Sequence, residues 1–146
     1  MKWSFLFLIL TLTSCSMKST TNNNVPNGKH GLWIEEQTDG LTAVGTYKKG
    51  LKEGDWIFYK NNICVKKLRY TGDQLNGLAQ SFFPNGNLKL QMHYENDRIN
   101  GLVYFYSETN IHLATYTYVY DKLSEVDFYL AHPDGPPKNR TFIPKL

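Results

Sequence analysis

The chain has 146 residues, enough for one domain, and its formal net charge of +3 is too small to indicate a nucleic-acid-binding surface. Ten Tyr, eight Phe and three Trp, together with frequent Gly, favour strands and turns over helices. The cysteines, Cys15 and Cys64, lie in segments of different character, so we expect no disulfide framework and a fold held by packing.

The N-terminal residues, MKWSFLFLILTLTSC, place Lys2 before an apolar run that is shorter than the about 20 residues needed to span a bilayer. The pattern predicts a signal peptide over residues 1–14. Leu12-Thr13-Ser14-Cys15 resembles the lipobox of bacterial lipoproteins, and the resemblance implies that Cys15 becomes the acylated first residue. Several acyl chains together give firm membrane anchoring. An ordinary secretory signal with an incidental Cys is the alternative.

Cleavage after residue 14 would remove Lys2 and leave a net charge of 3 − 1 = +2. Ser16 provides no aspartate-type signal for inner-membrane retention, so we expect a lipid-anchored protein of the bacterial cell envelope, on the outer membrane rather than the inner. Residues 15–27 are polar and low in complexity, and we interpret them as the lipidated Cys and a flexible tether.

Residues 28–130 contain a repeat with a glycine at its start. The glycines are Gly31, Gly54, Gly77 and Gly101, at intervals of 23, 23 and 24 residues, and Glu125 stands where a fifth is expected. Tyr47, Tyr70, Tyr94 and Tyr118 follow the same period. Periods of this length are typical of stacked arrays. We number the units 1 to 5 after these five positions. We expect each glycine to lie where an aromatic ring or the backbone approaches too closely to leave room for a Cβ.

The second half of each unit alternates between apolar and polar residues, as in Leu88–Tyr94, which predicts a half-buried strand. Cys64, Lys66, Leu68 and Tyr70 are expected to share a phase, as are His112, Ala114, Tyr116 and Tyr118. Turn dipeptides that tolerate positive φ separate the strands. Within units they are Asp39-Gly40, Asn61-Asn62, Asn85-Gly86 and Thr109-Asn110, and between units Lys49-Gly50, Gly72-Asp73, Asn96-Asp97 and Asp121-Lys122. The sequence therefore predicts an all-β, repetitive antiparallel β-meander.

The spacing of Gly, Trp, Tyr and Asn-Gly in Gly54–Gly101 resembles the variant MORN repeat of bacterial YwqK-like proteins, a family often labelled antitoxin components. The resemblance implies an elongated single sheet of stacked hairpins and an antitoxin- or immunity-like role. Ala79 and Val103 depart from the pattern, because Trp33 and Trp56 occupy the equivalent positions in units 1 and 2. Pro-rich residues 131–146 are expected to cap the sheet, and His132-Pro133-Asp134-Gly135 has the phase of a last hairpin turn.

No acid, base, nucleophile or metal-ligand motif converges in the sequence, so we expect neither an enzyme nor a cofactor or metal site. His30, His93, His112 and His132 fall in different units. A recurrent aromatic set is the candidate binding face: Trp33, Trp56, Phe58, Tyr59, Phe82, Phe83, Tyr104, Phe105 and Tyr106. Rings that only pack against one another as the core are the structural alternative. We expect a protein-interaction module, or alternatively a carbohydrate- or cell-wall-binding lipoprotein.

Overall fold

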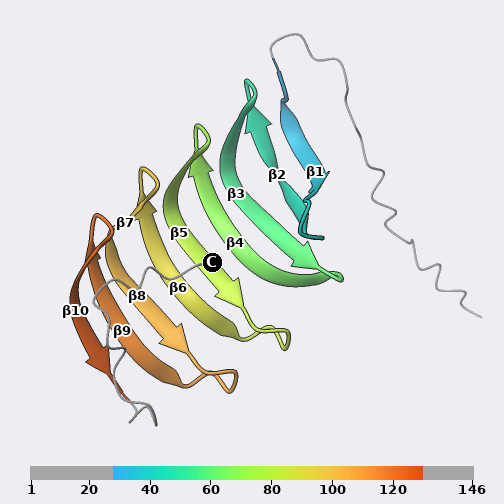
Figure 1. Ribbon diagram of the computed structural model, residues 1–146. Coiled ribbons are helices and arrows are strands. Elements are labelled where there is room, and N and C mark those ends of the chain that lie inside the picture. The colour runs from blue at the N-terminus through green and yellow to red at the C-terminus, as the bar shows by residue number, and fades with distance from the viewer. Residues whose placement is uncertain (1–27, 130–146) are drawn as a thin grey trace, which may run out of the picture.

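The computed structural model describes residues 28–129, which form an all-β domain of ten antiparallel strands (Figure 1). The strands are β1 (Gly31–Glu36), β2 (Thr42–Lys48), β3 (Leu51–Lys60), β4 (Ile63–Thr71), β5 (Gln74–Phe82), β6 (Leu88–Glu95), β7 (Arg98–Ile99), β8 (Gly101–Tyr106), β9 (His112–Val119) and β10 (Lys122–Phe128). The predicted fold class is confirmed. The predicted signal peptide, tether and cap lie outside the described residues.

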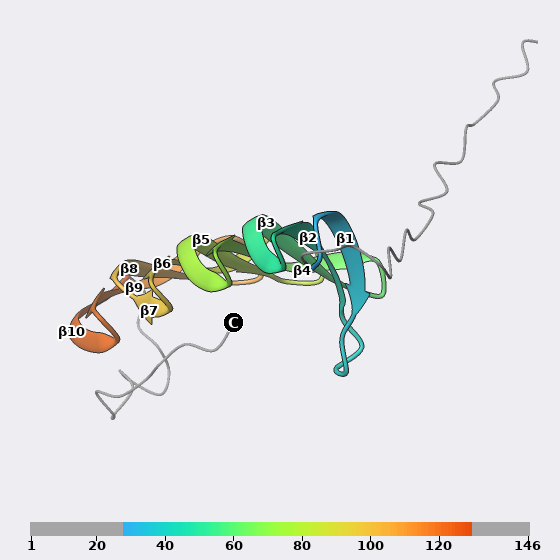
Figure 2. The ribbon, with the colours of Figure 1, turned by 90° about the horizontal axis from the view of Figure 1, so that it is seen from above.

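Each strand pairs with the next along the chain, and only β7 departs from this order, because it pairs with β6 just before β8 does. The result is one open sheet of stacked hairpins. Figure 2 shows that this sheet is a single layer along its whole length. Two faces must therefore be distinguished, and the alternation of side chains along each strand assigns every residue to one of them.

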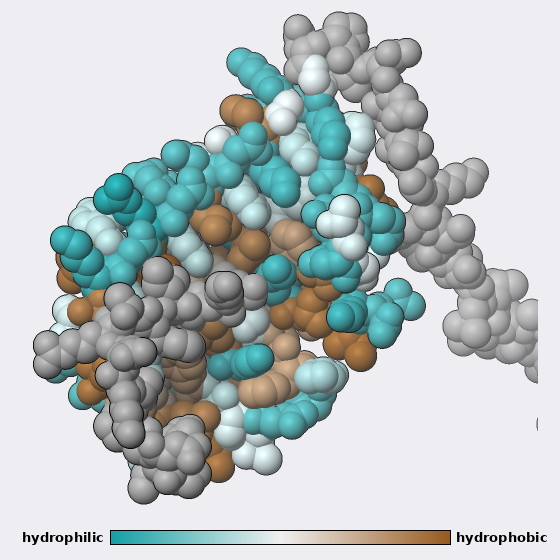
Figure 3. Space-filling view, viewed as in Figure 1, coloured by the Kyte–Doolittle hydropathy of each residue, from teal (hydrophilic) through white to brown (hydrophobic). Residues whose placement is uncertain are grey.

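One face, which we call the packed face, carries the hydrophobic core. Its buried apolar residues are Ala43, Tyr47, Trp56, Phe58, Leu68, Ala79, Leu90, Met92, Ile99, Val103, Ala114, Tyr116 and Tyr118. Apolar side chains gather across the middle of the sheet in Figure 3, with polar ones along its rims. The opposite, open face presents exposed residues such as Leu32, Leu78 and Leu102. The alternation predicted for Leu88–Tyr94 is confirmed, because Leu90 and Met92 are buried while Lys89 and His93 are exposed.

The repeat glycines are required by backbone conformation. Gly31, Gly54, Gly77 and Gly101 have φ of 79°, 74°, 118° and 103°, values that side chains disfavour. The expectation of a close ring is wrong, because a Cβ at Gly31, Gly54 or Gly101 would meet nothing within 4 Å, and only Gly77 has a near neighbour, the side chain of Arg69. Gly54 and Gly77 lie in bulges where three residues of one strand face a single residue of its neighbour.

Unit 5 lacks this glycine altogether. Glu125 pairs with Thr117, which on its other side pairs with Leu102, the residue after Gly101. Only Ser124 and Glu125 lie between Leu123 and Val126, so the bulge is shorter there than in unit 3, where three residues separate Leu75 from Ala79. Glu125 therefore does not replace the glycine, as the sequence suggested; the glycine position is deleted.

A second bulge recurs near the other end of the hairpins of units 2, 3 and 4, where the pairing shifts between Phe58 and Tyr59, Ser81 and Phe82, and Phe105 and Tyr106. The bulge shifts the phase of the following strand, so Val65, rather than the predicted Cys64, packs against the core.

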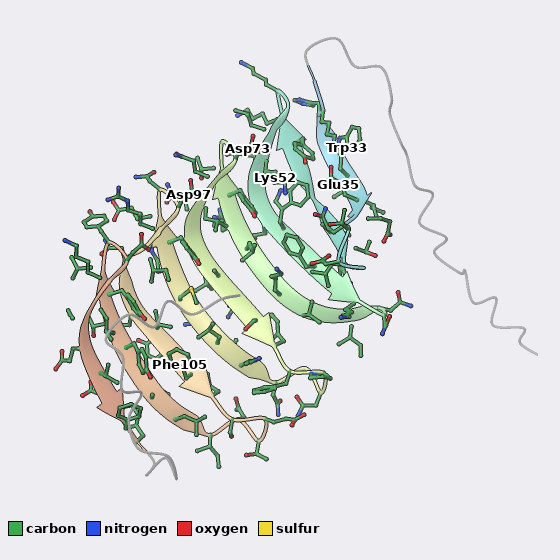
Figure 4. The ribbon with its side chains drawn as sticks, in the orientation of Figure 1. Trp33, Glu35, Lys52, Asp73, Asp97 and Phe105 are labelled. Atoms are coloured by element: carbon green, nitrogen blue, oxygen red, sulfur yellow. The ribbon has the colours of Figure 1, made fainter. Side chains whose placement is uncertain are left out.

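The last three tight turns between units carry aspartates that join neighbouring units. In each, the carboxylate Oδ1 accepts a backbone N–H of the preceding unit, and the aspartate N–H donates to the carbonyl of that same residue. The Oδ1 contacts are Asp73 to Lys52 at 2.6 Å, Asp97 to Leu75 at 2.7 Å and Asp121 to Ile99 at 2.7 Å. The reverse bonds are 3.0, 2.9 and 2.9 Å long. Figure 4 shows Asp73 and Asp97 along this rim of the sheet.

The turns differ in detail from the prediction. Both central residues have positive φ at Lys49-Gly50, Asn61-Asn62, Gly72-Asp73 and Asn96-Asp97, as expected. The last turn is Tyr120-Asp121, one residue earlier than predicted. The other hairpins close through longer loops with one left-handed residue each, namely Gly40, Gly86 and Asn110.

Small residues of the packed face lie opposite large ones of the neighbouring strand, as Gly45 does opposite Trp33 and Ala79 opposite Leu68. Trp56, with 0% of its surface exposed, lies directly on Gly45, where an added Cβ would be 2.2 Å from the indole ring. In the next unit Leu68 pairs with Ala79, so the larger residue is on the other strand. Gly45 leaves room for the large ring of Trp56, whereas Leu68 fills the corresponding space beside Ala79. Position 79 therefore has no volume left for a Trp side chain.

Candidate functional site

The N-terminal half of the packed face carries lysines seated on aromatic rings. In the first Lys–aromatic cluster, Lys29 Nζ lies 4.8 Å from the Trp33 ring centroid and 4.7 Å from that of Tyr47. Glu35 forms an ion pair with Lys29 and accepts a hydrogen bond from Tyr47 Oη at 3.1 Å. A carboxylate therefore neutralises the cation of this cluster.

The second Lys–aromatic cluster repeats this arrangement one unit later. Lys52 Nζ lies 4.4 Å from the Trp56 ring centroid and 5.2 Å from that of Tyr70. The rings of the two clusters form a continuous edge-to-face series, with Tyr47 and Trp56 centroids 5.0 Å apart. Figure 4 shows Trp33, Glu35 and Lys52 together at this end of the sheet.

Aliphatic residues replace these lysines at the equivalent positions of units 3 to 5. Lys29 and Lys52 precede their repeat glycines by two residues, and the equivalent residues of units 3 to 5 are Leu75, Ile99 and Leu123. Leu75 and Leu123 pack against the core and Ile99 belongs to it. The Lys–aromatic clusters are therefore confined to units 1 and 2, although the hairpins continue through β10.

The tyrosines of this face are held in their neutral form. Burial, followed by the hydrogen bond and the charge of Glu35, raises the pKa of Tyr47 to about 12. Burial also raises the pKa of Tyr118 to about 12, with Tyr116 adding to the effect. The pKa of Tyr70 is raised first by burial and then by the charge of Asp97. At neutral pH these tyrosines are uncharged, so they supply no anion that would pair with the lysines.

A cleft of about 370 Å³ opens at the end of the packed face opposite the aspartate turns. Lys60, Lys66 and Lys89 line it with one carboxylate, Asp39, and its apolar wall includes Phe82. Lys66 Nζ also lies 5.0 Å from the Phe58 ring centroid, so its charge extends the basic character of the aromatic surface.

The predicted binding residues do not form one ladder. Trp56 and Phe58 are buried in the packed face, and Trp33 and Phe105 are half-buried on it. Tyr104 pairs with Thr115 on the open face, because neighbouring residues of a strand point to opposite sides.

The other members of the set lie beyond the second bulge. Tyr59 and Phe82 pair with Cys64 and Leu88 there, and Phe83 begins a loop. The ring centroid of Tyr106 is 5.2 Å from that of His112.

The described residues contain no group of three or more His, Cys, Asp or Glu side chains arranged to hold a metal ion. Cys64 has a free thiol, and Cys15 lies outside the described range. Sequence reasoning missed Lys29 and Lys52, which alternation alone would assign to solvent. Their shared position, two residues before the repeat glycine, is the signal that identifies them.

Comparison with known proteins found no matching family model and no matching curated protein. Across residues 28–129 there is no helix long and apolar enough to cross a membrane.

Proposed function

We propose that the chain is a lipid-anchored repeat protein of the bacterial cell envelope that acts as a protein-interaction module. The observation that carries this proposal is the packed face of units 1 and 2. Within residues 28–129 no second layer covers it, and half-buried rings such as Trp33 and Tyr70 lie there beside partly exposed lysines. Aromatic side chains with neighbouring cations are typical of protein interfaces.

The position of the lysines favours a protein partner over the alternative, a carbohydrate or cell-wall ligand. Sugars bind by stacking on open ring faces, whereas Lys29 lies over the rings of Trp33 and Tyr47, and Lys52 over those of Trp56 and Tyr70. An antitoxin- or immunity-like role is a special case of this proposal, and its only support is the resemblance of the repeat to YwqK-like proteins.

The membrane anchor in this proposal rests on the lipobox-like residues that end at Cys15. In that arrangement residues 15–27 would display the rigid sheet at a distance from the bilayer, and the packed face would be accessible to a partner in the envelope.

Chemical crosslinking in cells, followed by mass spectrometry of the captured material, tests the proposal. One dominant protein partner is expected. Recovery of wall fragments without a protein would favour the carbohydrate alternative, and a shift in tryptophan fluorescence on titration with peptidoglycan fragments would give it independent support.

A further inference from the structure

We propose that the second Lys–aromatic cluster recognises the carboxylate of an aspartate or glutamate side chain on a protein partner. The inference rests on the proposed function and specifies the chemistry of the partner. It follows from a comparison of two units that both place a lysine over a Trp and a Tyr ring but differ in whether a carboxylate of the chain reaches that lysine.

Unit 1 shows the filled form of the site. Lys29 sits on its two rings, and the carboxylate of Glu35 reaches its ammonium group. In unit 2 the residue at the position of Glu35 is Phe58, since each lies four residues after its repeat glycine. The second cluster therefore has the cation and the rings but lacks the carboxylate.

Nothing else in the described chain supplies that carboxylate. Among residues 28–129 the ion pairs within 4.0 Å are Lys29–Glu35 and Arg69–Asp55. The nearby acids are engaged elsewhere: Asp73 accepts the backbone N–H of Lys52, and Glu53 accepts that of Gly72. The ammonium group of Lys52 is left to an external anion.

The surroundings of Lys52 define the ligand further. The Trp56 and Tyr70 rings hold the ammonium group in place and remove part of its water, which strengthens an ion pair formed there. The half-buried Tyr70 ring offers an apolar surface beside it, and Lys66 provides a second cation over the buried ring of Phe58. An acidic side chain flanked by apolar residues fits this combination of charge and surface.

Peptide selection tests the inference. The purified chain is panned against a random dodecapeptide library, and the enriched sequence is synthesised with its acidic residue and with the matching amide. We expect the enriched peptides to share an Asp or Glu between apolar residues, and the amide to bind about tenfold more weakly. Lys52→Leu should cause the same loss, and the fold should tolerate it, because Leu75 and Leu123 occupy the equivalent position.

Lys122→Leu, which removes one exposed lysine from β10, is the matched control and should bind as the wild type does. Glu35→Gln should free Lys29 and add a second binding equivalent for the acidic peptide. Peptides that bind without an acidic residue, or independently of Lys52, would overturn this inference and leave the interaction module standing. An absence of enriched peptides also overturns it, and if in-cell crosslinking captures no protein either, the proposed function fails as well.

Two further outcomes would identify a different occupant. Binding of phosphatidylglycerol-containing vesicles that is lost in Lys52→Leu, with no peptide selected, would assign the site to an anionic lipid surface. Peptide binding that appears only in Asp134→Asn would show that the chain's own C-terminal residues take the site. Either result contradicts a partner's carboxylate as the ligand.

Discussion

The contact between Gly45 and Trp56 gives the sharpest prediction for stability. A Cβ at Gly45 would lie 2.2, 2.3 and 2.5 Å from three atoms of the Trp56 ring. Non-bonded carbons prefer about 3.5–4.0 Å, so the ring or the strand must move by more than about 1 Å. A core that absorbs such a shift loses about 1–3 kcal/mol, and one that expels the ring loses about 3–5 kcal/mol. Because Trp56 is fully buried, we expect Gly45→Ala to cost about 3 kcal/mol.

Urea unfolding followed by tryptophan fluorescence measures this cost, and a double mutant checks its cause. Trp56→Ala alone should lose about 3–5 kcal/mol through a cavity. Gly45→Leu combined with Trp56→Ala recreates the Leu68–Ala79 pair of the next unit. Its loss of stability should be smaller, by at least about 1 kcal/mol, than the sum of the losses measured for Gly45→Leu alone and Trp56→Ala alone. Wild-type stability of Gly45→Ala, or strict additivity in the double mutant, would refute the proposed exchange of volumes.

Three further predictions follow from the turns, the first cluster and the N-terminus. Asp97→Gly keeps a residue suited to φ 66° but removes the acceptor of the Leu75 N–H. Urea unfolding should show a free energy of unfolding lower by about 1 kcal/mol, and an unchanged value would contradict a stabilising role for this hydrogen bond. Glu35→Gln should lower the pKa of Tyr47 from about 12 without restoring 10, since burial is the larger cause, as ¹³C-tyrosine NMR would show. The raised pKa favours the protonated tyrosine of the folded state, so its contribution to stability is present below pH 10 and is lost as the pH rises toward 12. Cys15→Ser should release the protein from the membrane fraction, and unchanged fractionation would exclude lipidation.

The backbone architecture could be predicted from the sequence because its signals are local. Alternation over Leu88–Tyr94 and turn residues such as Asn61-Asn62 determine strands and hairpins without reference to distant residues. The bulges are less visible, because an inserted residue such as Val65 changes the phase of a strand without altering its composition. The predicted position of Cys64 was wrong for this reason.

The function of each repeated residue was harder to predict than its position. The period identified the glycines, but only their φ angles show that backbone conformation, and not a close ring, requires them. The glycine that does contact a ring, Gly45, stands outside the repeat pattern. Asp73, Asp97 and Asp121 were visible at intervals of 24 residues, yet their bonds to the preceding unit depend on how the hairpins stack.

The candidate site could be predicted only in part. Aromatic residues were correctly singled out as recurrent, but consecutive rings such as Tyr104 and Phe105 lie on opposite faces. The lysines of the site escaped notice because a charged residue in a strand is ordinarily solvated. Only the packing of Lys29 and Lys52 over rings shows that they belong to the packed face.

Residue-specific photo-crosslinking in cells tests whether the packed face contacts a protein partner. A photoreactive phenylalanine analogue would replace Tyr70, which is half-buried on the packed face, and in a matched variant His93, which is exposed on the open face. We expect one dominant protein adduct from position 70 and none from position 93. Equal adducts from both positions, or no protein adduct from position 70, would contradict an interaction module that works through its packed face.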